Sequence, residues 1–139
     1  MQEVLRIGNV ESFKAATVLA GGVARRGETC GALLGALMAV GLVQGRTEMT
    51  DRERYQAAMA TAQRVTAAFR QRVQSGFDLA AQPATTLCRD LHKAVYGRTF
   101  DLNDPADYEA FLAAGGHSPT GCPKICGLAA EAAAEALIG

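Results

Sequence analysis

The chain has 139 residues, no net formal charge at pH 7, and 49% hydrophobic against 20% charged residues, which is typical of one globular domain. Zero net charge argues against a nucleic-acid-binding protein, because such proteins usually carry a basic excess. The longest uncharged apolar run covers residues 30–43 and contains three glycines, so it is too short for a membrane span of about 20 residues.

Helical patterns extend along nearly the whole sequence, and no stretch alternates polar and apolar residues as a half-buried strand does. Start and stop signals, such as the Thr50–Glu53 capping box and the Asp104-Pro105 pair, divide the pattern into six helices. These helices are expected at about residues 10–24, 28–43, 50–76, 85–96, 104–115 and 122–139. The sequence therefore predicts an all-α fold, a single compact domain over residues 1–139.

Small residues recur every four positions around the second predicted helix, at Gly27, Gly31, Gly35 and Ala39. Residues at this spacing lie nearly in one row along a helix, and each glycine costs a helix about 1 kcal/mol. We expect a tight helix–helix crossing to offset this cost. Alternatively, the bare face leaves room for a ligand or cluster beside Cys30.

Sulfur is the element best able to carry an activity, because the chain has four cysteines, two histidines and no paired carboxylates in an apolar setting. No secretory signal is evident, so we expect a cytoplasmic protein, in which cysteines more often serve metal binding or redox chemistry than structural disulfides. Cys122 and Cys126 are four residues apart and share a helix face, and Cys88 and His92 repeat this spacing. Cys122 also opens a helix, where the helix dipole favours a thiolate.

Four thiols suit zinc and both common kinds of iron–sulfur cluster. The chain lacks the Cys-x-x-Cys pairs typical of such sites, and free cysteines are often small buried hydrophobic residues. The histidines are weaker candidates. His92 is explained equally well as a surface residue and as a ligand, and His117 is more typical of an exposed loop residue, although it could act on a thiol or bind a metal.

The residues around Cys30 resemble a known family. Residues 30–35, Cys-Gly-Ala-Leu-Leu-Gly, match the signature of the C-GCAxxG-C-C family of putative redox-active proteins, and the resemblance covers about residues 11–135. It continues in residues 13–16, 21–22, 26–30, 87–91 and 122–125. The resemblance implies a helical fold and a redox role. It also implies a relation to a domain of the split-Soret cytochromes, whose relatives carry an iron–sulfur centre.

Cys30, Cys88 and Cys122 match three cysteines of that family, and the resemblance implies that they are its catalytic or ligand residues. A further family cysteine upstream of the signature has no counterpart here, whereas Cys126 is extra. We therefore expect Cys30, Cys88 and Cys122 to converge in the fold, with Cys126 as the thiol able to replace the missing ligand.

Two functions remain open, and neither involves nucleic acid or membrane insertion. In the first, the cysteines hold an iron–sulfur cluster for electron transfer with a redox partner protein, or they cycle between thiol and disulfide. In the second, a non-enzymatic helical module binds zinc or no metal and mediates dimerisation or a partner contact. Residues 1–100 carry an excess of five positive charges and residues 101–139 five negative ones, so we expect these parts to pack together, within one subunit or across a homodimer.

Overall fold

The computed structural model describes residues 2–139. Within these residues the chain forms seven α-helices and one short 3-10 helix, with no strand. They are α1 (Gln2–Leu5), α2 (Val10–Ala16), η1 (Thr17–Leu19), α3 (Gly31–Gln44), α4 (Arg52–Gly76), α5 (Cys88–Tyr96), α6 (Pro105–Ala113) and α7 (Cys122–Ile138). The predicted all-α fold is confirmed.

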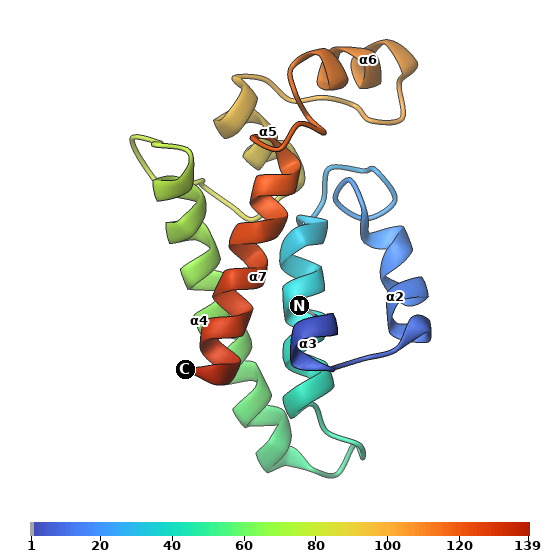
Figure 1. Cartoon of the computed structure of the whole chain (residues 1–139), viewed down its shortest axis with the longest axis vertical. Coiled ribbons are helices and arrows are strands. Elements are labelled where there is room, and N and C mark those ends of the chain that lie inside the picture. The colour runs from blue at the N-terminus through green and yellow to red at the C-terminus, as the bar shows by residue number, and fades with distance from the viewer. Residues whose placement is uncertain (1) are drawn as a thin grey trace.

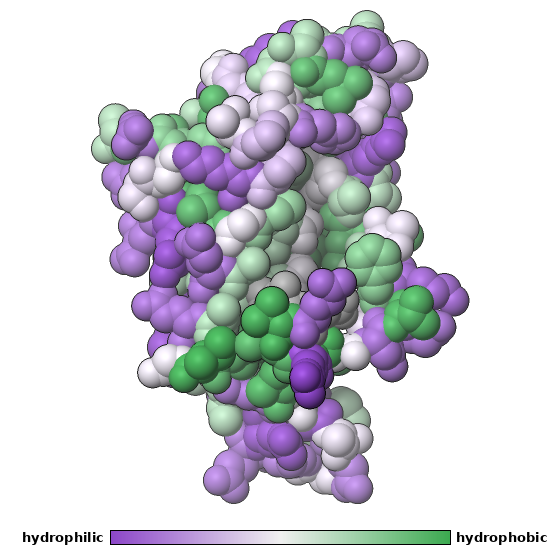
Figure 2. Space-filling model, viewed as in Figure 1, coloured by the Kyte–Doolittle hydropathy of each residue, from purple (hydrophilic) through white to green (hydrophobic). Residues whose placement is uncertain are grey.

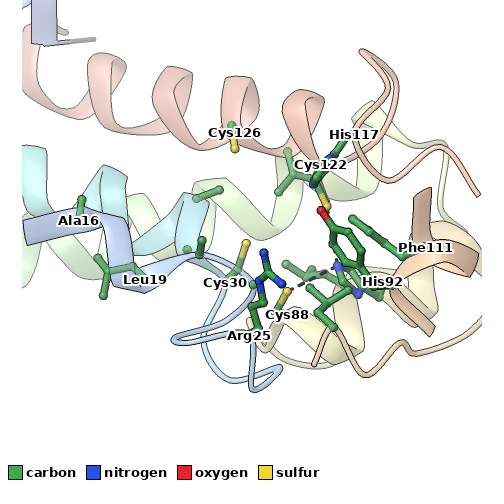
Figure 3. Close-up of a pocket in the computed structure, with 18 residues that line it drawn as sticks. Ala16, Leu19, Arg25, Cys30, Cys88, His92, Phe111, His117, Cys122 and Cys126 are labelled. Carbon is green, nitrogen blue, oxygen red and sulfur yellow. Dashed lines mark hydrogen bonds between the residues drawn. The ribbon is translucent and has the colours of Figure 1, made fainter. Parts of the chain in front are cut away.

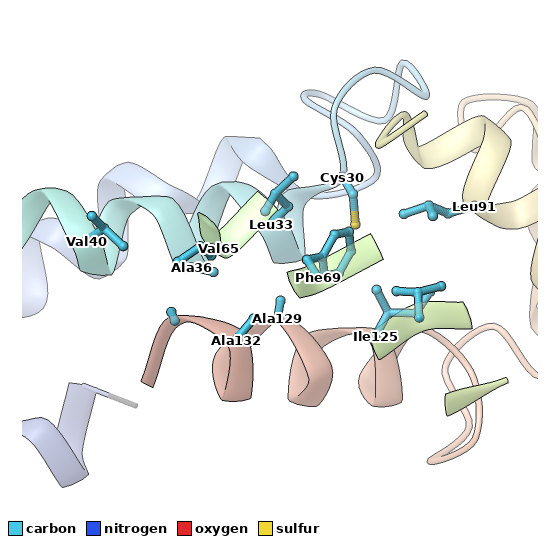
Figure 4. Close-up of a cluster of buried hydrophobic side chains, with 12 residues drawn as sticks. Cys30, Leu33, Ala36, Val40, Val65, Phe69, Leu91, Ile125, Ala129 and Ala132 are labelled. Carbon is cyan, nitrogen blue, oxygen red and sulfur yellow. The ribbon is translucent and has the colours of Figure 1, made fainter. Parts of the chain in front are cut away.

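The three longest helices, α3, α4 and α7, lie side by side and form the body of the molecule (Figure 1). Helix α4 turns one stripe of side chains inward at steps of three and four residues: Ala58, Thr61, Val65, Phe69 and Val73. Helix α7 presents mainly alanines to this stripe (Figure 4). Such small side chains let the helices approach closely, and burying one large side chain such as Phe69 contributes about 1.5–3 kcal/mol.

Side-chain caps fix where two of the helices begin. The Asp51 carboxylate accepts a hydrogen bond of 2.9 Å from the backbone N–H of Arg54, so Asp51 caps α4 in place of the predicted Thr50. At α6, Asp104 accepts a hydrogen bond of 2.8 Å from the backbone N–H of Asp107, and Pro105 occupies the first turn, as predicted.

The predicted helix over residues 10–24 is wrong beyond α2. After η1 the backbone takes positive φ angles at Gly21, Gly22 and Gly27, and also at residues 23–25, which a right-handed helix excludes. Residues 20–30 form a loop that turns back towards α5, and an isolated antiparallel bridge joins Thr29 to Leu87. The second predicted helix therefore starts at Gly31 and not near residue 28.

The row of small residues does not form one continuous crossing. Gly27 precedes α3. A Cβ at Gly31 would lie 2.5 Å from the carbonyl oxygen of Leu19, so the close approach expected there is present. A Cβ at Gly35 would have no described atom within 4 Å, because this residue faces open space. The expected tight crossing is therefore wrong at Gly35.

Charged residues of the two halves meet within one chain. Arg72 of α4 forms ion pairs with Glu131 and Glu135 of α7, and Arg98 pairs with Asp107. On the face shown in Figure 2, hydrophobic side chains gather in the lower middle, and hydrophilic side chains lie mainly along the edges. Across residues 2–139, no helix combines the length and hydropathy needed to cross a membrane. Pairing of two chains stays a prediction.

Candidate functional site

A cavity of about 490 Å³ lies between the loop of residues 20–30, η1, and helices α5, α6 and α7. Apolar side chains make up most of its walls, and all four cysteines and both histidines also line it (Figure 3). A water molecule occupies about 30 Å³ in the liquid. The cavity therefore has room for a metal cluster or a small molecule, and far more than a single ion needs.

Backbone pairing places Cys30 next to Cys88 at one wall of this cavity. Cys30 directly precedes α3, and its N–H donates to the carbonyl of Thr86 at 2.9 Å. Cys88 is the first residue of α5, and its N–H donates to the carbonyl of Glu28 at 2.7 Å. These two bonds hold thiols 58 residues apart in sequence against the same space.

Gly22 makes this arrangement possible. A Cβ at Gly22 would lie 2.6 Å from the Cβ of Cys88 and 2.6 Å from the carbonyl oxygen of Glu28. Its φ of +74° also favours glycine. The loop therefore passes against the start of α5 closely enough to carry Cys30 into the cavity.

His92 lies between two of the thiols. Its Nε2 is 3.5 Å from the Sγ of Cys88 and 3.7 Å from the Sγ of Cys122. The side chain is only 2% exposed, so the alternative that His92 is a surface residue is wrong. One turn of α5 brings the ring to Cys88, and the start of α7 brings Cys122 to the same ring nitrogen.

Aromatic rings enclose the His92 imidazole on its other sides. Phe111 stacks on it with ring centroids 5.1 Å apart and planes inclined by 25°. Tyr96 and Phe100 meet it edge-on at 5.6 and 5.8 Å. Tyr96 also places its hydroxyl 3.4 Å from the Sγ of Cys122. This packing fixes the orientation of the imidazole.

The remaining candidates lie nearer to solvent. Cys126 is exposed but still lines the cavity one turn of α7 beyond Cys122, so the two thiols do share a face. His117 is exposed, as expected of a loop residue, and meets Phe111 edge-on at 5.4 Å. Arg25 is exposed and also lines the cavity beside Cys30 and Cys88 (Figure 3), with its guanidinium carbon 5.1 Å from the ring centroid of Tyr108.

Burial keeps the thiols of the metal-free protein protonated. Desolvation raises the pKa of Cys30 to about 11 and that of Cys88 to about 12. It also raises the pKa of Cys122, although the Tyr96 hydroxyl opposes this shift. The thiolate preference expected for Cys122 from the helix dipole is therefore outweighed by loss of water.

The four thiols line one cavity without forming a single-ion site among the described residues. Among residues 2–139, no group of three or more His, Cys, Asp or Glu side chains is close enough to hold one ion. All four thiols line this larger space, and, besides desolvation, the proximity of Cys30 and Cys122 raises the pKa of Cys88. Cysteine sulfur is the ligand type of both iron–sulfur clusters and structural zinc sites.

Sequence reasoning missed the central position of His92 and the contact of Tyr96 with Cys122. The spacing of four between Cys88 and His92 was a signal for the first. The second depends on how α5 meets α7, which no local pattern reports.

The chain matches the family model described as "Putative redox-active protein (C_GCAxxG_C_C)" over residues 1–136. It therefore belongs to this family, and the resemblance seen around Cys30 is confirmed. No match was found among curated proteins or among solved structures.

Proposed function

We propose that this chain is an electron-transfer protein whose cavity holds an iron–sulfur cluster. The observation that carries the proposal is that four cysteines from three separate parts of the sequence line one cavity of cluster size. Membership in a family described as redox-active supports the redox role. Cys30, Cys88 and Cys122 would bind the cluster, and Cys126 is available as a fourth thiol.

The residues of the cavity have separate tasks in this proposal. When bound, the cluster supplies one-electron exchange with a redox partner protein. The apolar walls exclude water, and the backbone bonds of Cys30 and Cys88 hold their sulfurs in place. Because burial raises the pKa of the thiols, each must release its proton as the cluster binds.

A thiol/disulfide couple is the second candidate, and one contact favours it. Cys88 and Cys122 touch the same His92 nitrogen, so their sulfurs are no farther apart than the sum of those two contacts. Their oxidation would form one S–S bond and release two protons and two electrons to a disulfide of a partner protein. The raised thiol pKa values disfavour this at neutral pH, because the thiolate is the attacking species.

The test is to isolate the full chain without air and to measure iron, acid-labile sulfide, zinc and visible absorption. The proposal predicts iron and sulfide together with absorption in the visible range. Zinc without sulfide would instead support the helical zinc-binding module. A metal-free protein with a Cys88–Cys122 disulfide in its mass spectrum would support the thiol couple.

Variants show whether bound iron occupies the cavity. Cys88→Ser and Cys122→Ser should each lose most of the iron and the visible absorption. Met49→Ser is the matched control, because it removes sulfur from a side chain that is 78% exposed and does not line the cavity. Equal iron content in all three variants would place the metal elsewhere.

A further inference from the structure

We infer that His92, and not Cys126, supplies the fourth ligand beside Cys30, Cys88 and Cys122. This inference rests on the proposed function. It gives the cluster three thiolates and one imidazole, a mixed donor set known from cysteine–histidine metal sites.

The position of the imidazole favours it as a ligand. Its Nε2 faces the sulfurs of two proposed ligands at 3.5 and 3.7 Å, so a group bound by Cys88 and Cys122 would lie within reach of this nitrogen. Both sulfurs and the imidazole line the same cavity. No other pair among the four cysteines shares a hydrogen-bonding side chain of this kind in the described structure.

The hydrogen-bonding capacity of His92 is only partly used. The side chain is 2% exposed, and its Nδ1 has no hydrogen-bond partner among the described residues. Leaving a buried polar atom unpaired is unfavourable, and the contacts of Nε2 with sulfur are weak hydrogen bonds. An apolar residue would fill this position at lower cost. A ligand bond from Nε2 would replace its two weak sulfur contacts by a strong one, whereas Nδ1 stays unpaired with or without the ligand.

Packing holds the imidazole ring in advance of any ligand bond. The stack on Phe111 and the edges of Tyr96 and Phe100 restrict how the imidazole can turn. Ligands that packing fixes before binding lose little freedom when the metal arrives. Cys126 contrasts with this, because it is exposed and nothing in residues 2–139 gives its sulfur a side-chain hydrogen bond.

A histidine ligand would change which redox partner suits the site. Replacing thiolate by neutral imidazole removes negative charge from the cluster and raises its reduction potential, as in centres with histidine ligands. The partner protein that reduces this site can therefore be a weaker reductant than a four-cysteine cluster would require.

The test uses the full chain reconstituted without air with iron and sulfide, reduced with dithionite and examined by pulsed electron paramagnetic resonance. The expected spectrum contains a strongly coupled nitrogen that changes on labelling with ¹⁵N-histidine. The same signal should persist in His117→Leu, which removes the other histidine of the cavity. This measurement needs no substitution at His92, so it stands even where a His92 variant fails to fold.

Variants separate the two possible fourth ligands. His92→Leu should lose the nitrogen signal and release iron to a chelator at least about tenfold faster. Cys126→Ser should keep both the signal and the release rate. His92→Cys should keep the cluster, lose the nitrogen signal and lower the midpoint potential.

The outcomes distinguish the two proposals. A reconstituted protein without iron and sulfide would overturn the proposed function and this inference together. A cluster without histidine coupling, lost in Cys126→Ser and kept in His92→Leu, would overturn the inference alone.

Discussion

The three-helix core and the cysteine-lined cavity differ in the kind of side chain that they bury. In the core, α3, α4 and α7 contribute apolar residues at helical spacing, and Val65, Phe69 and Val73 are completely buried. At the cavity, two thiols and an imidazole are buried with weak or missing hydrogen bonds. The comparison indicates that the core supplies stability, whereas the cavity keeps groups that stability alone would not favour.

The largest effect is expected in the core. Phe69→Ala removes a side chain with 0% exposure and should lower the free energy of unfolding by about 3–5 kcal/mol, because a cavity remains. Chemical denaturation followed by circular dichroism measures the loss. Met59→Ala on the same helix is the control, since Met59 is 40% exposed and its loss should cost far less. Equal losses would contradict the assignment of the core to the inward face of α4.

An alkaline pH should destabilise the metal-free protein because two thiols that line the cavity are buried. The pKa of Cys30 rises to about 11 and that of Cys88 to about 12, from an ordinary value near 9. Above pH 9 the unfolded chain loses these protons while the folded chain keeps them, so stability falls as pH rises. The slope is about 1.4 kcal/mol per pH unit for each thiol.

Denaturation curves between pH 8 and pH 10.5 measure this slope. Stability should be nearly level below pH 9 as far as these thiols contribute. The Cys30→Ala/Cys88→Ala double variant should show a flatter decline above pH 9. An unchanged slope in the double variant would mean that the two thiols are not desolvated in the folded protein.

Two glycine substitutions in α3 should change the free energy of unfolding by smaller amounts, and their effects should differ in sign. Gly31→Ala should destabilise the protein by about 1–3 kcal/mol, because the new Cβ meets the carbonyl oxygen of Leu19 at 2.5 Å. Gly35→Ala should be neutral or stabilise it by up to about 1 kcal/mol, since the Cβ enters open space on a helix. Thermal unfolding of the two variants compares them directly. Similar losses of stability in both variants would contradict the open space at Gly35 and indicate a continuous close helix crossing.

The core could be predicted from the sequence because the spacing of its apolar residues is a pattern within single helices. The steps from Val65 through Phe69 to Val73 define a buried stripe on any helix that forms there. The shared face of Cys122 and Cys126 was equally readable from their spacing. Family residues around Cys30 added the redox role.

The cavity could be predicted only in part, because its geometry depends on contacts between distant segments. The left-handed backbone of residues 23–25 has no local signal in Val-Ala-Arg, and the carbonyl of Arg25 accepts a hydrogen bond from the side chain of Asn103, 78 positions away. The burial of His92 depends on Phe111, which is 19 positions away. The desolvation that outweighs the helix dipole at Cys122 also results from contacts with segments that are distant in sequence.

A redox titration of the reconstituted full chain under argon shows whether the cavity carries electrons, as proposed. The visible absorption is recorded against solution potential in both directions. We expect one reversible transition in which a tenfold change in the ratio of oxidised to reduced protein takes about 59 mV, the value for one electron. A metal-free protein would show no visible transition, and a slope of about 30 mV in a parallel titration followed by thiol labelling would indicate a two-electron thiol couple. No reversible transition in an iron-loaded protein would contradict the claim.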